Sequence, residues 1–105
     1  MRIMSDYRKF SIYKIYLIKD PSICYVGSTI NFSRRKSQHK KNCINRTSKK
    51  YKYPLYQFIR SMGGWDNFNI EILEKYPCNT KQEGLEREKA LIRIHDAKIN
   101  VNKPI

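Results

Sequence analysis

Arg35 and His39 stand four residues apart in a basic stretch of the chain. In a helix this spacing brings two side chains onto the same side, one turn apart. A guanidinium and an imidazole that point the same way can bind one phosphate group together. Arg35 also belongs to the run Arg34-Arg35-Lys36, so a solvated basic helix face is the alternative interpretation.

Glu88 combines a charged side chain with an apolar setting. It lies three residues after Leu85 and three before Leu91, which places it on the apolar side of a helix. A carboxylate that faces inward needs a cation, a metal ion or hydrogen bonds to offset its lost hydration. Glu88 is therefore a site candidate, and a structural salt bridge to a lysine or arginine is the alternative.

Two tyrosines belong to consecutive predicted strands. Residues 12–19 and 23–28 are rich in aromatic and β-branched side chains, and Asp20-Pro21-Ser22 between them is typical of a turn. A hairpin that is symmetric about this turn places Tyr16 directly opposite Tyr25. Two phenols would then project from one face, although an ordinary cross-strand aromatic pair gives the same pattern.

The remaining elements must hold these side chains in place. Asn31 can cap a helix that runs from Phe32 to about Cys43, and a second helix begins near Pro54 and ends at Gly63-Gly64. Both faces of the first strand carry apolar or aromatic groups, which indicates a central strand covered on two sides.

A third strand and a third helix complete the predicted fold. Residues 68–73 alternate apolar and polar side chains over most of their length, and Thr80 with Glu83 forms a capping-box signature before a helix. The predicted order is β-β-α-α-β-α, without repeats or linkers. It indicates an α+β fold in one domain over residues 1–105.

The composition is that of a small basic protein. Lys and Arg number 22 against nine Asp and Glu in 105 residues, which gives a formal net charge of +13. Such a charge attracts polyanions, and nucleic acid is the partner we expect. Charge alone does not distinguish a binding protein from an enzyme.

Cysteine usage and hydropathy argue against several other classes. Cys24, Cys43 and Cys78 are odd in number and contain no C-x-x-C pair, so we expect buried apolar side chains. Residues 1–11 lack the apolar run of a signal peptide, and no stretch is long enough to span a membrane. We expect an intracellular protein, in the cytoplasm or in the nucleus of a eukaryotic or viral host.

The middle of the chain carries a continuous basic segment. Between Asp20 and Asp66 there are ten basic residues and no acidic one, with Tyr51, Tyr53 and Tyr56 near its end. Lysines and arginines suit a phosphate backbone, and tyrosines can stack on unpaired bases. A flexible solvated loop is the alternative.

The tyrosines of the two predicted strands, the Arg35–His39 pair and Glu88, taken in this order, resemble the GIY-YIG nuclease family over most of the chain. Gly64-Trp65-Asp66-Asn67-Phe68 also resembles a segment of homing-type and viral members. Lys14 stands in place of the name-giving glycine, and Val26 in place of the isoleucine of the second triplet. The residues that carry the resemblance are Lys14-Ile15-Tyr16, Tyr25-Val26-Gly27-Ser28, Arg35-x-x-x-His39, Glu88 and Asn102.

The resemblance implies a three-stranded antiparallel sheet flanked by helices and a DNA endonuclease that hydrolyses phosphodiester bonds. By resemblance, Glu88 binds a single Mg²⁺ ion, with Mn²⁺ as an alternative. Tyr16 would orient or deprotonate the water, and Arg35 would stabilise the transition state. Tyr25 and His39 would position the phosphate or tune the base. We expect further substrate contacts from Lys14, Arg34, Lys36, Lys40 and Asn102.

DNA is the expected substrate, ahead of RNA. Two other functions stay open at this point. One is a catalytically silent nucleic-acid-binding module, and the other is a nuclease subunit that depends on a partner protein. A missing specificity domain or a partner that selects the cleavage site also stays open.

Overall fold

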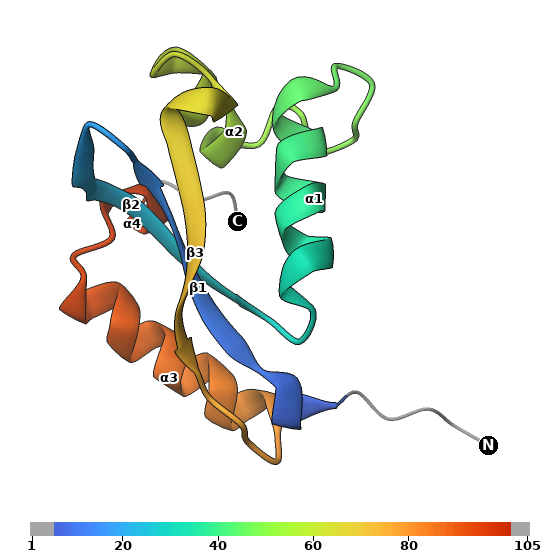
Figure 1. Ribbon diagram of the computed structural model, residues 1–105, viewed down its shortest axis with the longest axis vertical. Helices are drawn as coiled ribbons and strands as arrows, with labels where there is room; N and C mark the ends of the chain where they lie inside the picture. Colours follow the sequence, from blue (N-terminus) through green and yellow to red (C-terminus); the bar gives the residue numbers. More distant parts are fainter. Residues whose placement is uncertain (1–5, 102–105) are drawn as a thin grey trace.

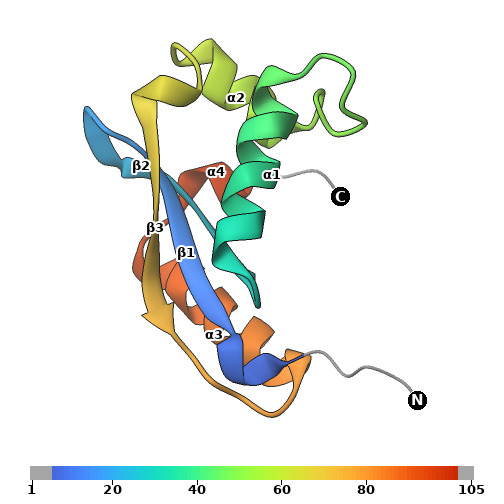
Figure 2. The ribbon, with the colours of Figure 1, turned by 45° about the vertical axis from the view of Figure 1, so that its right-hand side comes forward.

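A computed structural model describes residues 6–101 of the chain. A central antiparallel sheet separates one group of helices from another (Figures 1 and 2). The predicted α+β class and the order β-β-α-α-β-α are confirmed, and a short helix, α4, follows. In chain order the elements are η1 (Tyr7–Lys9), β1 (Ser11–Leu17), β2 (Asp20–Thr29), α1 (Phe32–Ile44), α2 (Pro54–Ser61), η2 (Trp65–Asn67), β3 (Phe68–Lys75), α3 (Lys81–Ile94) and α4 (Lys98–Val101).

The sheet has the strand order β2-β1-β3, and both neighbours run antiparallel to β1. The prediction of a central first strand is therefore confirmed. Ile12 and Ile15 are both fully buried although they point to opposite faces. A strand covered on two sides needs apolar residues at consecutive positions, and this is why β1 lacks a polar face.

The β1–β2 hairpin turns two residues earlier than the sequence indicates. Leu17 pairs with Asp20, so the loop is Ile18-Lys19 and not Asp20-Pro21-Ser22. The Asp20 carboxylate accepts hydrogen bonds from the backbone N–H and the hydroxyl of Ser22, at 3.2 and 2.6 Å. The turn-forming residues thus bond locally within β2, and the strand register shifts between Tyr16 and Leu17.

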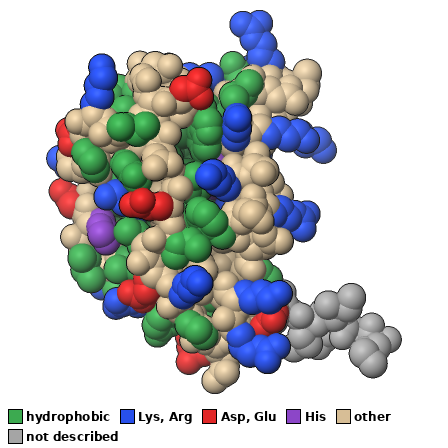
Figure 3. Space-filling model, viewed as in Figure 1, with side chains coloured by type: hydrophobic (Ala, Val, Ile, Leu, Met, Phe, Trp, Pro, Cys, Tyr) green, Lys and Arg blue, Asp and Glu red, His purple; other side chains and the backbone are tan. Residues whose placement is uncertain are grey.

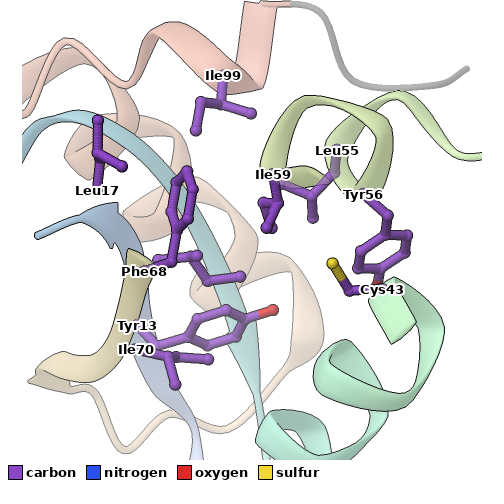
Figure 4. Packing of buried hydrophobic residues seen from close by; sticks show 10 residues of the cluster. Tyr13, Leu17, Cys43, Leu55, Tyr56, Ile59, Phe68, Ile70 and Ile99 are labelled. Atoms are coloured by element: carbon purple, nitrogen blue, oxygen red, sulfur yellow. The ribbon is translucent and has the colours of Figure 1, made fainter. Parts of the chain in front are cut away.

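Two apolar clusters hold the helices against the sheet. On one face Tyr13, Ile15 and Leu17 pack with Ile59 of α2 and Ile99 of α4, and Cys43 extends this cluster to α1 (Figure 4). The other cluster joins the opposite face of the sheet to α3. Its buried members are Phe10, Ile12, Cys24, Val26, Leu91 and Ala97.

Side-chain caps fix where the two longest helices begin. The Asn31 side chain accepts a hydrogen bond from the Arg34 backbone N–H at the start of α1. Thr80 and Glu83 form the predicted capping box at the start of α3. Each cap satisfies backbone donors that a helix leaves free at its first turn. By fixing where the helix begins, it also fixes which side of the helix the following site residues face.

Two of the three cysteines are buried, as expected, and the third is not fully buried. Cys24 and Cys43 are buried, Cys78 is half-buried, and all three are free thiols. Within residues 6–101, no helix is both long and apolar enough to cross a membrane.

Candidate active site

β1 and β2 place two phenols on the face of the sheet that α1 and α2 cover. Tyr13 is paired with Gly27, and Tyr25 is paired with Ile15. Paired residues share a face, as do alternate residues along a strand. Tyr13 and Tyr25 therefore lie on the same face, where Tyr13 is part of the core and Tyr25 packs against it.

Tyr16 lies on the other face, and the structure does not bring it together with Tyr25. The predicted Tyr16–Tyr25 pair is wrong because the early turn shifts the register by one, so that Tyr16 is paired with Cys24. The Tyr16 hydroxyl donates to the Glu71 carboxylate at 3.5 Å and accepts from the Asn69 amide at 3.1 Å. These partners belong to β3.

Lys14 shares the face of Tyr16 because the two residues alternate along β1. Its ammonium lies 5.1 Å from the centroid of the Tyr16 ring. A cation over an aromatic face is a stabilising local contact. Lys14 thus lies on the face of the sheet away from Arg35 and His39, and its expected contact with the substrate stays a prediction.

α1 brings His39 against Tyr13. His39 is 5 % exposed, and both of its ring nitrogens have phenol partners. Its Nε2 lies 2.7 Å from the Tyr13 hydroxyl, and its Nδ1 lies 2.8 Å from the hydroxyl of Tyr56 on α2. The Tyr25 ring lies edge-on to the imidazole, with centroids 6.3 Å apart.

Arg35 lies on the same side of α1, one turn before His39, as the sequence predicts. Its positive charge acts on the imidazole and on the phenols of Tyr13, Tyr25 and Tyr56. One guanidinium thus exerts its positive charge on a cluster of four aromatic side chains.

Burial controls the protonation of this cluster. It lowers the pKa of His39 to about 4, and the nearby charges of Arg35 and Lys50 act in the same direction. Burial also raises the pKa of Tyr25 to about 12, helped by the negative charge of Glu88 and opposed by Arg35. At neutral pH the imidazole and the phenol are both uncharged, and Arg35 provides the fixed positive charge.

A cleft of about 300 Å³ opens beside these residues. Basic and polar side chains from both helices surround it, and no acidic residue lines it. Such a lining suits an anion. The lining residues are Tyr25, Arg35, Gln38, His39, Asn42, Lys50, Tyr53, Leu55 and Tyr56.

Glu88 reaches β2 from α3, on the other side of the sheet. Its carboxylate accepts a short hydrogen bond from the Ser28 hydroxyl, and its charge acts on Tyr25. The structural salt bridge that was the alternative for Glu88 is not seen. The ion pairs within residues 6–101 are Arg8–Asp6 and Arg87–Glu74.

Sequence reasoning missed Tyr13 and Tyr56. A signal for Tyr13 was present, because Ser11-Ile12-Tyr13 carries the same Ile-Tyr pair as Lys14-Ile15-Tyr16 three residues earlier. The small Ser11 also resembles glycine more closely than Lys14 does. No comparable signal marks Tyr56, for which the sequence allowed either base stacking or a solvated loop, and which is 4 % exposed in the structure.

The expected substrate-binding residues differ in where they lie in the structure. Arg34, Lys36 and Lys40 are exposed on α1, on a side of the molecule where Figure 3 shows lysines and arginines gathered. Asn102 lies outside the described residues. Asn100 is buried.

Asn100 ties α4 to the outer edge of the sheet. Its side-chain oxygen accepts from the Val26 N–H at 2.7 Å, and its amide nitrogen donates to the Val26 carbonyl at 2.8 Å. The amide thus pairs with an edge strand as another strand would. This contact holds the stretch of β2 that carries Tyr25 and Gly27.

Comparisons with known proteins agree with this arrangement. The family model of the GIY-YIG catalytic domain matches residues 9–100. Among solved structures, the catalytic domain of the homing endonuclease I-TevI is similar with a TM-score of 0.69 and 29 % sequence identity, over 88 % of this chain and 94 % of that one. No curated protein sequence matches the chain. The chain therefore belongs to the GIY-YIG catalytic domain family, a family of nuclease domains.

Proposed function

We propose that this domain is a DNA endonuclease that hydrolyses phosphodiester bonds with the help of one divalent metal ion. The observation that supports the proposal best is the cleft in which Arg35, His39 and Tyr25 meet, with the Glu88 carboxylate within electrostatic reach of Tyr25. Cleavage of a phosphodiester requires stabilisation of negative charge and an oriented water. These residues offer both.

Glu88 is the residue that would hold the metal ion. It is half-buried and hydrogen-bonded to Ser28, and neither ion pair of the described chain uses it. No group of three His, Cys, Asp or Glu side chains within residues 6–101 could enclose an ion. This donor set fits Mg²⁺ or Mn²⁺, since Mg²⁺ is often bound by one or two carboxylates with waters and substrate phosphates as further ligands. Such an ion, when bound, acts as a Lewis acid on phosphoryl oxygens.

The protein's own residues divide the remaining work. Arg35 stabilises the charge that develops on the phosphoryl oxygens, because a guanidinium offers several donors in one plane. Tyr25 orients the attacking water, since its pKa of about 12 keeps it a neutral phenol. His39 stays neutral and is held by two phenols, so it braces the wall of the cleft.

The exposed cations of α1 extend the site toward the rest of the substrate. Arg34, Lys36 and Lys40 contribute counterion release along a phosphate backbone. Contacts of this kind position DNA without reading its sequence. Recognition of a particular sequence would then fall to another segment or to a partner protein.

The deciding experiment is cleavage of labelled duplex, branched and single-stranded DNA with Mg²⁺, with Mn²⁺ or with EDTA. We compare the native protein with Glu88→Gln and with Glu86→Gln as the matched control, because Glu86 is exposed on the same helix. Products that need the ion and disappear in Glu88→Gln alone support the proposal. Binding without cleavage by the native protein contradicts it and favours the silent module or the partner-dependent subunit.

A further inference from the structure

A chain of hydrogen bonds links three elements behind the cleft. Tyr13 of β1 bonds to His39 of α1, His39 bonds to Tyr56 of α2, and the Asn42 amide donates to the Tyr56 hydroxyl at 3.3 Å. The Asn42 oxygen in turn accepts from the Ser48 hydroxyl at 2.6 Å. With the amide in this orientation, its N–H group points to Tyr56.

Which group donates in each of these hydrogen bonds depends on the single ring proton of His39. Burial and two nearby cations make the imidazole neutral at physiological pH. A neutral imidazole has one donor nitrogen and one acceptor nitrogen. One phenol therefore donates to His39, and the other accepts from it.

Tyr13 decides which phenol donates. It is 1 % exposed and does not line the cleft, so water offers its proton no acceptor. Among the described residues, His39 Nε2 is the hydrogen-bond partner of the Tyr13 hydroxyl, and the nearby Arg35 carries donors alone. The Tyr13 proton must therefore go to Nε2 of His39, since a buried donor left without an acceptor costs about 1–3 kcal/mol. The ring proton of His39 then sits on Nδ1.

Tyr56 consequently receives two hydrogen bonds, one from His39 Nδ1 and one from Asn42. A hydroxyl oxygen has two lone pairs, and both are now occupied. Its own proton has to point elsewhere, and Tyr56 lines the cleft together with Arg35 and Lys50. A hydroxyl in a cleft that Arg35 and Lys50 also line, with its proton free to turn toward that cleft, suits a phosphate oxygen.

We propose that Tyr56 is a further substrate-binding residue, whose hydroxyl donates to a phosphate oxygen of the nucleic acid in the cleft. This role rests on the proposed function for its substrate class. The bonds from His39 and Asn42 orient the hydroxyl before the substrate arrives, which lowers the entropy lost on binding. They also polarise it, since hydrogen bonds in a chain strengthen one another.

The first test is the tautomer of His39 in the protein without DNA. Two-bond proton–nitrogen spectra of ¹⁵N-labelled protein distinguish a protonated from an unprotonated ring nitrogen, and His95→Gln assigns the signals because the chain has two histidines. We expect the proton on Nδ1. A proton on Nε2 overturns the proposal, since Tyr56 would then donate to His39 and have nothing left for a phosphate.

The second test is binding of labelled duplex and branched DNA in EDTA at fixed salt. We expect Tyr56→Phe to raise the Kd about tenfold, because a hydrogen bond to a charged group is lost. Tyr51→Phe is the matched control, since Tyr51 lies in the same basic segment but not in the cleft, and its Kd should not change. An unchanged Kd for Tyr56→Phe overturns the proposal.

The two tests are independent of catalysis. A protein that binds DNA but never cleaves it would contradict the endonuclease function, whereas the His39 tautomer and the Kd for DNA could still be measured. If Tyr56→Phe does not fold, the His39 tautomer in the native protein still tests the proposal.

Discussion

Gly27 lies opposite Tyr13 in the β1–β2 pair, and the end of the Tyr13 ring fills the space where any other residue would carry its Cβ. A Cβ on Gly27 would stand 2.6 Å from the Tyr13 hydroxyl oxygen and 2.7 Å from Cζ. Nonbonded atoms of this kind need roughly 3.5 Å. The glycine thus allows Tyr13 to reach His39.

Gly27→Ala should therefore displace the Tyr13 phenol and weaken its hydrogen bond to His39. We expect a loss of about 1–3 kcal/mol in the free energy of unfolding, the usual cost of overpacking, measured by urea denaturation. The same substitution in a Tyr13→Leu background should cost much less, because the clashing ring atoms are gone. Equal costs in the two backgrounds would show that the contact is not the reason for the glycine.

The elements of the fold could be predicted from the sequence because their signals are local. Asn31 caps α1, Pro54 begins α2 and Thr80 with Glu83 caps α3, each through atoms a few residues apart. The helix face shared by Arg35 and His39 follows from the same short-range geometry.

The register of the hairpin could not be predicted in this way. The turn-forming residues at positions 20–22 predict a reversal there, whereas in the structure Asp20 bonds to Ser22 within β2. A one-residue slip moves every side chain of a strand to the other face, and so Tyr16 was placed where Tyr13 lies. The position of Tyr56 in the site could not be predicted because it depends on packing between α1 and α2, which no local pattern encodes.

Phenylalanine substitutions can separate the three strand tyrosines. Tyr25→Phe should lower the cleavage rate about 100-fold, because misplacing the attacking water has an effect of that order. Tyr13→Phe should also lower it, since His39 loses its partner. Tyr16→Phe is the matched control on the opposite face of the sheet, and its rate should equal that of the native protein in a single-turnover assay. A large loss in Tyr16→Phe would contradict the assignment of faces.

The protonation of His39 makes stability depend on pH. In the unfolded chain its pKa is near the ordinary 6.5, whereas in the folded protein it is about 4. As the pH falls from 6.5, the unfolded state therefore takes up a proton that the folded state does not. The free energy of unfolding should fall by up to about 1.4 kcal/mol per pH unit in this window, and the loss should level off below the folded pKa.

This slope is best measured by urea denaturation from neutral pH down to about pH 5, above the range in which the carboxyls with lowered pKa, Asp6, Asp20 and Glu74, titrate. His39→Gln should flatten the curve, and His95→Gln should leave it steep. A native curve that is already flat would mean that His39 can be protonated without cost in the folded state.

Removing the Asn100 amide should loosen the edge of the sheet. Asn100→Ala leaves the buried N–H and carbonyl of Val26 without their partners, and we expect a loss of about 2–4 kcal/mol in the free energy of unfolding. Cleavage should fall as well at temperatures where the variant is folded, because Tyr25 is next to Val26. Asn79→Ala, at an exposed position, is the control. Equal stability of the two variants would show that the amide is not needed to hold the strand.

The exposed cations of α1 should govern the salt dependence of DNA binding. Each lysine that neutralises a phosphate releases a counterion, so Lys36→Ala and Lys40→Ala should each reduce the slope of log K against log salt by about one. Lys89→Ala on α3 is the matched control, because it removes the same charge from an exposed position on the other side of the sheet. The slopes are measured by fluorescence anisotropy in EDTA over a series of salt concentrations. An equal decrease in all three variants would mean that the whole charge of the protein attracts the DNA. A decrease confined to the α1 variants would place the phosphate backbone along this helix, beside the cleft that holds Arg35.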